Sequence, residues 1–334
     1  VMSFAAVQKP VRRELEQVQT LLRDAFRTSI PILNQVGGHV LASRGKKIRP
    51  TLLLLTARMR GPVGEEAVMS AAVVEMLHAA ALIHDDAVDS SVLRRGLPTV
   101  NGLWTDEMAI IMGDYLFGHA LNVLVRHRMG LALEVLSRIV GEMTGGEALE
   151  FQYAYDLEVG EAQYEELIRA KTGSLMGAAT EIGAGLWGGP NVARRRAAFR
   201  EFGERLGTAF QIVDDLLDYL GDPEVTGKPV GGDLAEGKIT LPLIAALREA
   251  SEADGRRLKR LALRKRWTPT QWSQLRLLID KCGGFAYARK RAEAMAAESQ
   301  RLLAEYPTPP HDAGAAAARR ALARSADHAV RRDR

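Results

Sequence analysis

The sequence has one cysteine, few aromatic residues and no long uninterrupted apolar run. A single thiol, Cys282, excludes an internal disulfide framework and is typical of proteins in a reducing compartment. The longest apolar stretches, 51–57 and 71–83, fall short of the roughly 18 residues that a membrane span needs, and the second contains Glu75 and His78. The chain also starts without the pattern of an export signal. We therefore expect a cytoplasmic protein with no transmembrane segment.

The sequence also has no large excess of basic over acidic residues. The 334 residues carry a formal net charge of +4, and the small basic clusters have no aromatic residues between them. Because nucleic-acid surfaces usually have a basic stripe or stacking aromatic rings, nucleic acid is not an expected partner. No linker rich in proline, glycine or serine divides the chain. We expect one domain over residues 1–334, whose C-terminal tail, about 327–334, frays.

Helical periodicity is present along the whole chain. Apolar residues recur every three or four positions, whereas no run alternates as a half-buried strand would. The predicted fold class is therefore all-α. The pattern predicts helices over residues 11–26, 65–89, 107–126, 131–155, 164–186, 192–220, 240–250, 270–278, 285–305 and 313–326.

Two acidic pentapeptides of the form DDxxD lie within this helical pattern, in LIHDDAVD and in QIVDDLLDYL. A buried carboxylate without a partner is unstable, so something positive should face them. On a helix the first and last aspartates of such a motif share a face, and oxygen ligands so placed suit Mg²⁺ bound to a substrate phosphate. One such motif alone is usually a solvated acidic face. Two copies, each behind apolar residues, predict a metal site made by Asp85, Asp86, Asp89, Asp214, Asp215 and Asp218.

Basic and polar residues recur beside the acidic motifs. In GKKIRP, Lys46 and Arg49 stand three residues apart where a helix would start, which is a suitable place to hold a phosphate. Taken alone, this segment is equally a solvated capping turn, and each other candidate is more often a surface residue. The remaining candidates are Arg94, Arg95, Lys171, Thr172, Gln211, Lys228 and Lys238. Together they fit an anionic small molecule that a metal ion bridges to the protein.

The motifs, in the order GKKIRP, LHAAALIHDDAVDSSVLRRG, GDYL, KTGSL, GTAFQIVDDLLDYLGD and GKPVGGDLAEGKITLPL, resemble the trans-isoprenyl diphosphate synthases, the polyprenyl synthetase family. The resemblance spans residues 45–243 and is strongest to long-chain, octaprenyl-type members. It implies an antiparallel helical barrel with a deep central cavity, and a homodimer. It also implies a Mg²⁺-dependent prenyltransferase that joins isopentenyl diphosphate head to tail to an allylic primer, which is farnesyl, geranyl or dimethylallyl diphosphate.

The resemblance implies a role for each motif residue. The diphosphate of isopentenyl diphosphate would be held by Lys46, Arg49, His78 and Arg95. Roughly three Mg²⁺ ions bound to Asp85, Asp89 and Asp214 would hold the diphosphate of the primer, whose direct contacts would be Arg94, Lys171, Lys228 and Lys238. Oxygen dipoles near the developing carbocation would come from Thr172 and Gln211, and the metal motifs would be completed by Asp86, Asp215 and Asp218. The catalytic candidates are Asp85, Asp89, Asp214, Lys171, Thr172, Gln211 and Lys228, whereas His84 is expected to be structural.

Product length should depend on the residues one helical turn below the first acidic motif. Ala81 and Ala80 precede Asp85 by four and five residues, about 6 to 7 Å at 1.5 Å per residue. In the family, bulky aromatic residues there stop the growing chain, so two alanines favour an open cavity. We expect an all-trans product of about thirty-five to fifty carbons for quinone side chains, with octaprenyl as the central expectation. The alternative is a shorter geranylgeranyl or farnesyl product, with a floor made by Met76, Leu77, Met112, Tyr115, Leu116 or Phe117.

Two other classes of protein stay open. A class I terpene cyclase also combines DDxxD, Mg²⁺ and an apolar cavity, but it would have no use for an extender site at Lys46, Arg49 and Arg95. A non-catalytic subunit of a heteromeric synthase would have lost its acidic motifs, and both are intact here. For an elongating enzyme with a long apolar product, we also expect transient contact with a membrane surface on release.

Overall fold

The computed structural model describes residues 4–42, 45–94, 96–221, 231–264 and 266–331. Within these residues the regular structure is helical apart from one two-stranded hairpin, so the all-α prediction is confirmed. In chain order the elements are α1 (Phe4–Gln8), the 3₁₀ turn η1 (Lys9–Val11), α2 (Arg12–Ala25), α3 (Pro31–Ala42), α4 (Ile48–Arg58), α5 (Glu65–Val88), β1 (Leu93–Arg94), β2 (Leu97–Pro98), α6 (Val100–Leu103), α7 (Asp106–Arg126), α8 (Gly130–Tyr153), α9 (Glu161–Ile168), the π-helical turn η2 (Arg169–Gly173), α10 (Ser174–Gly185), α11 (Val192–Leu220), α13 (Gly232–Ala235), α14 (Leu241–Glu249), α15 (Glu252–Ala262), α16 (Pro269–Lys281), α17 (Gly284–Ala304) and α18 (Ala313–Val330).

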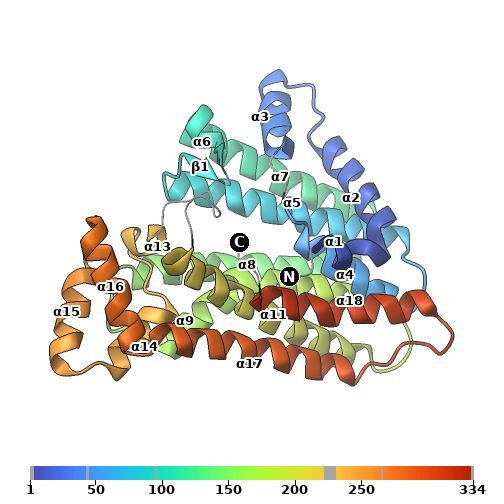
Figure 1. Ribbon diagram of the computed structural model, residues 1–334. Helices are drawn as coiled ribbons and strands as arrows, with labels where there is room; N and C mark the ends of the chain where they lie inside the picture. The colour runs from blue at the N-terminus through green and yellow to red at the C-terminus, as the bar shows by residue number, and fades with distance from the viewer. Residues whose placement is uncertain (1–3, 43–44, 95, 222–230, 265, 332–334) are drawn as a thin grey trace.

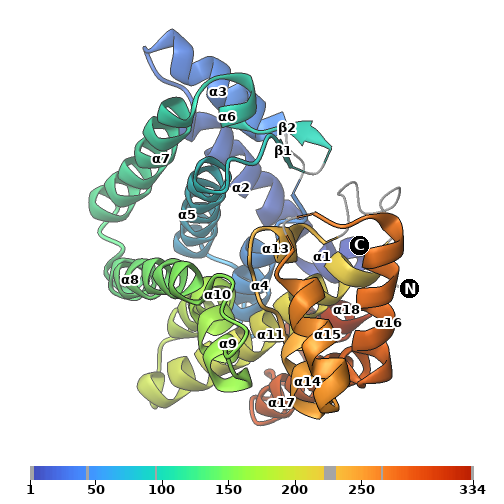
Figure 2. The same cartoon turned by 90° about the vertical axis from the view of Figure 1, so that its left-hand side faces the viewer.

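The long helices form two groups that face one another (Figure 1). In the upper group α5 packs against α7 and α2, and Figure 2 shows it between these two helices. In the lower group α11 packs against α10 and α17, and α4 connects the groups through its contacts with both α5 and α10. Helix α1 lies against α18, so the two ends of the described chain meet.

Most helix bounds agree with the sequence periodicity. The bounds of α11 are those predicted, and α2, α5, α7, α8, α14 and α17 differ from their predictions by at most two residues at either end. The segment predicted as one helix over 164–186 is instead α9, η2 and α10. Helix α18 continues to Val330, four residues beyond the helix end predicted at residue 326.

The apolar periodicity did not predict α3, α4 and α15, although a helix start beside Lys46 and Arg49 was expected. Helix α4 has no apolar stripe to detect because Leu52, Leu53, Leu54 and Leu55 are all fully buried. A helix that is apolar all round is one that the core surrounds, and it gives no amphipathic signal. Its N-terminal end, with Arg49 in the first turn, is therefore held firmly by the core.

Two helices, α5 and α7, are long and apolar enough to cross a membrane by length and composition, contrary to the expectation that no segment would be. In α5, 67% of the most apolar window is buried inside the protein, as expected for a core helix. In α7 the buried share of the corresponding window is 33%. One face of α7 is therefore both apolar and exposed.

Candidate active site

A cavity of about 690 Å³ lies between the two groups of helices and receives both acidic motifs. Asp85 and Asp86 occupy the last turn of α5, and Asp89 follows its end. Asp214 and Asp215 lie near the C-terminal end of α11. Every predicted site residue that the structure describes lines this cavity, namely Lys46, Arg49, His78, Asp85, Asp86, Asp89, Arg94, Lys171, Thr172, Gln211, Asp214, Asp215, Asp218 and Lys238. Arg95 and Lys228 lie outside the described residues.

The middle aspartate of each motif is buried and held by neighbouring side chains. Asp86 is 6% exposed, and its Oδ1 accepts a hydrogen bond from Arg94 Nε at 2.7 Å. Because Arg94 lies in β1, this ion pair fastens the hairpin to the end of α5. Arg94, which was predicted to contact the primer, is therefore bound to a carboxylate of the protein in this structure.

Asp215 is the buried counterpart on α11, with 3% of its surface exposed. Its carboxylate accepts hydrogen bonds from Tyr164 Oη at 2.6 Å and from Gln211 Nε2 at 2.8 Å. Burial raises the pKa of Asp215 to about 7, although these two hydrogen bonds act to lower it. Gln211 Oε1 in turn accepts a hydrogen bond from Thr172 Oγ1 at 2.9 Å. The four side chains form one chain of hydrogen bonds that joins α9, η2 and α11.

The first and last aspartates of the motifs have different surroundings. Burial raises the pKa of Asp85, while Lys171 and Arg94 act to lower it. Asp89 Oδ2 lies 3.3 Å from Lys238 Nζ, an ion pair between the end of α5 and the segment before α14. Asp214 is exposed on the cavity wall.

Asp218, the last aspartate of the second motif, accepts hydrogen bonds from the backbone N–H groups of Gly232 at 3.1 Å and Asp233 at 3.3 Å. Its carboxylate thus caps the first turn of α13, as an acidic group commonly does at a helix N-terminus. Asp233 also lines the cavity, and burial together with the charge of Asp218 raises its pKa well above the usual value.

Two lysines are surrounded by carboxylates of the protein. Lys171 Nζ lies 2.9 Å from Glu147 and also contacts Glu150. Burial acts to lower the pKa of Lys171, but Glu150 and Glu147 outweigh it, so this pKa is raised. Burial in turn raises the pKa of Glu147 to about 7. Lys238 contacts Glu236 at 2.7 Å in addition to Asp89.

The expected extender site lies at the start of α4. Arg49 Nη1 is 2.9 Å from His78 Nε2, and both residues line the cavity. Lys47 has a left-handed backbone with φ of 52° and turns its Nζ to Glu75 at 3.0 Å. Lys46 lines the cavity beside it. The segment therefore brings three cations to one wall.

His84 does not line this cavity. Its Nε2 lies 3.2 Å from the carbonyl oxygen of Ile110 and 3.5 Å from Asp114 Oδ1, and the ring packs against Gly113 on α7. A side chain on Gly113 would overlap the ring, since an added Cβ would lie 2.1 Å from Nε2. These contacts support the prediction that His84 is structural, which stays a prediction.

The donor chemistry of the site fits Mg²⁺. Carboxylate oxygens from two helices face one cavity, and hard oxygen ligands are those that Mg²⁺ prefers. Among the described residues no three His, Cys, Asp or Glu side chains are gathered closely enough to hold a metal ion by themselves. A divalent ion here would therefore need ligands from water or substrate as well, which is usual for Mg²⁺.

The apolar part of the cavity differs from the expectation at one of the two alanines. Ala81 lines the cavity. Ala80 does not: it is 4% exposed and belongs to an apolar cluster with Ile83, Met112 and Leu116. The expectation that both alanines open the cavity was wrong for Ala80, because adjacent helix positions point about 100° apart.

Several cavity residues were missed from the sequence. Leu22 on α2 and Phe26, directly after that helix, line the apolar part. Met76 on α5, which was one of the alternatives considered for the floor, lines it too. The other five alternatives, Leu77, Met112, Tyr115, Leu116 and Phe117, are not among the lining residues. The acidic residues Glu147 and Glu150, three apart on α8, could have been found by their helical spacing. Nothing in the sequence marks Tyr164.

Comparison with known proteins decides the family. The model of the polyprenyl synthetase family matches residues 30–275. The chain belongs to the polyprenyl synthetase family. Among curated members it is 39% identical over 253 residues to the short chain isoprenyl diphosphate synthase of Methanothermobacter thermautotrophicus. This match covers 74% of this chain and 77% of that protein. It is 32% identical to the octaprenyl diphosphate synthase of Escherichia coli over 100% of both chains.

A solved member of the family shares the fold. The polyprenyl synthase of Caulobacter crescentus, crystallised with calcium and isoprenyl diphosphate, superposes with a TM-score of 0.90 at 33% identity. The match covers 99% of this chain and 98% of that one. The helical architecture expected from the sequence resemblance is therefore that of polyprenyl synthetases.

Proposed function

We propose that this protein is a prenyltransferase that joins isopentenyl diphosphate head to tail to an allylic diphosphate. One observation carries the proposal: two acidic motifs from α5 and α11 face a single cavity that also receives Lys46, Arg49, Lys171 and Lys238 and is lined by apolar residues such as Phe26 and Met76. A terpene cyclase would not require the second group of cations at Lys46 and Arg49, which lies beside His78. The related polyprenyl synthase that contains both calcium and isoprenyl diphosphate supports a divalent ion and a diphosphate in the same cavity.

The lysines at the cavity mouth would exchange partners when the primer binds. Lys171 and Lys238 are held by carboxylates in this structure, and the diphosphate of a primer offers oxygens that can replace them. Roughly three Mg²⁺ ions, held by Asp85, Asp89 and Asp214, would stabilise the departing diphosphate as Lewis acids. The lysines and the metal ions would thus place positive charge where negative charge develops as the carbon–oxygen bond of the primer breaks.

The carbocation left on the primer would be stabilised by oxygen dipoles. Gln211 is fixed by Asp215 on one side and by Thr172 on the other, so its amide cannot turn freely. The double bond of the extender supplies the electron pair of the new carbon–carbon bond, and one proton is then lost to the released diphosphate. Apolar residues such as Phe26 and Met76 exclude water, which would otherwise capture the cation.

The test is incubation of the purified chain with farnesyl diphosphate, labelled isopentenyl diphosphate and Mg²⁺. We expect labelled prenyl diphosphates that are absent without the metal or without the primer. Release of hydrocarbon from farnesyl diphosphate alone would identify a terpene cyclase instead. No turnover by the single chain would identify a non-catalytic subunit.

We propose a long-chain product, with octaprenyl as the central expectation. Support comes from Ala81, whose small side chain leaves the cavity open one turn below Asp85, and from the octaprenyl diphosphate synthase that aligns over the whole chain. The short chain relative keeps geranylgeranyl and farnesyl products as the alternative. Chromatography of the dephosphorylated products from the incubation above separates them.

We propose that the protein is a homodimer in which α7 of each copy faces the other. Ile110, Leu121 and Val125 lie on one face of α7 and are 50%, 37% and 63% exposed. Phe151 on the neighbouring helix α8 is 68% exposed. An apolar face of this extent is typical of an interface, and an identical copy can cover it with the same face. Sedimentation of Val125→Glu should show dissociation, with Leu277→Glu on α16 as the control.

We also propose a cytoplasmic location and transient contact of the product-loaded enzyme with a membrane surface. The single cysteine supports a reducing compartment. Val88, Val92 and Leu93, beside the first acidic motif, are 57%, 64% and 60% exposed, which supports contact with lipid near the cavity mouth. Co-sedimentation with vesicles, with and without bound product, would test that contact.

A further inference from the structure

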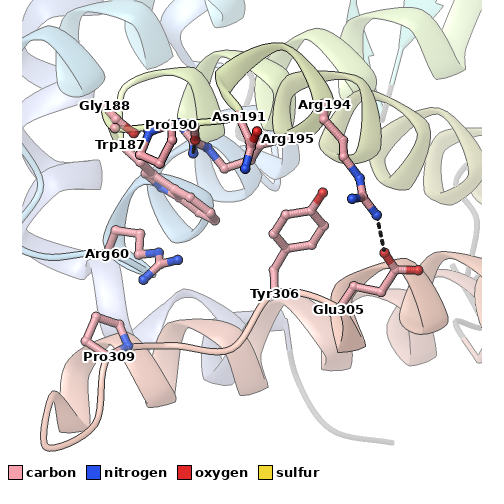
Figure 3. Close-up of a pocket in the computed structure, with 11 residues that line it drawn as sticks. Arg60, Trp187, Gly188, Pro190, Asn191, Arg194, Arg195, Glu305, Tyr306 and Pro309 are labelled. Atoms are coloured by element: carbon pink, nitrogen blue, oxygen red, sulfur yellow. Dashed lines mark hydrogen bonds and ion pairs between the residues drawn. The ribbon is translucent and has the colours of Figure 1, made fainter.

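A second cavity of about 570 Å³ lies at the far end of the lower group of helices. It is formed where α4 and α10 end, α11 begins and α17 ends, and Figure 3 shows its side chains turned toward one space. Arg194, on its wall, precedes Asp214 on α11 by 20 residues, which is about 30 Å along the helix. This cavity is therefore separate from the one that holds the acidic motifs.

Three arginines reach this second cavity, and they outnumber the acids. Arg194 has one acidic neighbour, Glu305, at 3.9 Å, and both side chains are largely exposed. Arg60 lies over the ring of Trp187, 5.6 Å from its centroid. Within the part of the chain that the structure describes, no ion pair balances the charge of Arg60. The cavity therefore has a net positive charge.

The third arginine, Arg195, orders the wall. It is 8% exposed, and its guanidinium donates hydrogen bonds to the carbonyl oxygens of Ala184, Gly188 and Pro190 at 3.0, 2.9 and 3.3 Å. These bonds fix the loop between α10 and α11, but none of them is to a carboxylate. Burial, together with the nearby Arg60, lowers the pKa of Arg195. Because no carboxylate neutralises Arg195, its positive charge adds to that of Arg60.

The backbone at this wall also favours an anion. Gly188, Gly189 and Asn191 all have left-handed conformations, with φ of 66°, 76° and 60°. The chain then enters α11, a helix of 29 residues, and the side chain of Asn191 makes no capping hydrogen bond to its first turn. The N–H groups at the start of a long helix carry a partial positive charge, which adds to that of the arginines.

We propose that this second cavity binds a small anion of the phosphate or diphosphate class, separately from catalysis. Arginine matches the geometry of phosphate oxygens, and two of the three guanidinium groups keep donors available. Trp187 and Tyr306 form an apolar wall beside them, so the anion can carry a hydrocarbon group. Trp187 Nε1 is held by the carbonyl oxygen of Thr56 at 2.9 Å, which fixes the indole as part of the wall.

The indole of Trp187 provides the measurement. Inorganic diphosphate is titrated into the full-length protein in EDTA, with tryptophan fluorescence as the signal, and Trp187→Phe identifies the part of the signal that comes from this cavity. We expect a saturable change that is lost in Trp187→Phe. The double substitution Arg60→Gln/Arg194→Gln should weaken binding by about tenfold or more, because two charge-assisted contacts are removed.

A matched control removes the same charge elsewhere. Arg257→Gln/Arg260→Gln, on the exposed face of α15, should leave the dissociation constant unchanged. Loss of affinity in both double variants alike, or a signal that does not depend on Trp187, would overturn the proposal. Geranyl diphosphate distinguishes the source: tighter binding than inorganic diphosphate identifies prenyl diphosphates, and equal binding identifies the inorganic ion. Because elongation activity is not part of this measurement, its result is independent of the proposed function.

Discussion

Substitution of Ala81 by phenylalanine tests how the cavity sets product length. Ala81 lines the cavity four residues before Asp85, so the new ring would lie about 6 Å below the acidic motif. A stop at this depth leaves room for roughly two or three five-carbon units above it. We therefore expect condensation to continue and products to shorten to about ten to fifteen carbons.

Ala80→Phe is the matched control, because it adds the same ring at a position that faces the core. Ala80 packs with Ile83, Met112 and Leu116 between α5 and α7. Insertion of a ring into a packed cluster typically destabilises by about 1 to 3 kcal/mol. We expect Ala80→Phe to lower the free energy of unfolding without shortening the product as Ala81→Phe does.

The assay combines two measurements on both variants. Products made with labelled isopentenyl diphosphate are dephosphorylated and separated by chromatography, and stability is measured by urea unfolding at equilibrium. If Ala81→Phe folds normally and its product distribution equals that of the original protein, then the cavity beneath Asp85 does not contain the growing chain and the reasoning fails.

Three further predictions concern single side chains. Asp214→Ala should remove most turnover, because several kcal/mol of transition-state stabilisation are lost. The free energy of unfolding should change little, since Asp214 is exposed on the cavity wall. A near-normal kcat would contradict the role of Asp214 as a metal ligand. Tyr164→Phe should lower the free energy of unfolding by about 1 to 3 kcal/mol, since it removes the 2.6 Å hydrogen bond to buried Asp215, and an unchanged urea midpoint would show that another donor replaces it. Asp312 accepts two hydrogen bonds of 3.0 Å from Arg58, which lower the pKa of its carboxyl to about 2. Because a lowered pKa stabilises the fold above the unfolded value of 3.8, the difference in Tm between the original protein and Asp312→Asn should be constant near neutral pH and vanish as the pH falls toward about 2.

The sequence predicts those parts of this molecule in which a local pattern decides the structure. Helix α11 has an apolar stripe along its whole length, and its predicted bounds are those observed. Helix α4 has no such stripe because its leucines are buried on every side, so periodicity could not find it. The contrast shows that periodicity detects helices at the edge of a core better than helices inside it.

The same distinction applies to the site. The order of the motifs identified residues that line one cavity, since spacing along a helix fixes which way each side chain points. It could not show that Asp86 would hold Arg94, or that Lys171 would lie between Glu147 and Glu150, because those partners come from other elements. The roles of these residues in binding substrate and metal stay predictions.

The π-helical turn η2 has a consequence for the evolution of this chain. Such a turn accommodates one residue more than an α-helical turn would. It lies between α9, which buries Tyr164 and Ile168, and α10, which is buried from Ser174 to Ala184. Loss of one residue there would rotate everything before it by about 100° relative to everything after it. Tyr164 would then leave Asp215, or α10 would leave its neighbours. Single-residue deletions should therefore be tolerated in the loops of related chains but not between positions 169 and 173.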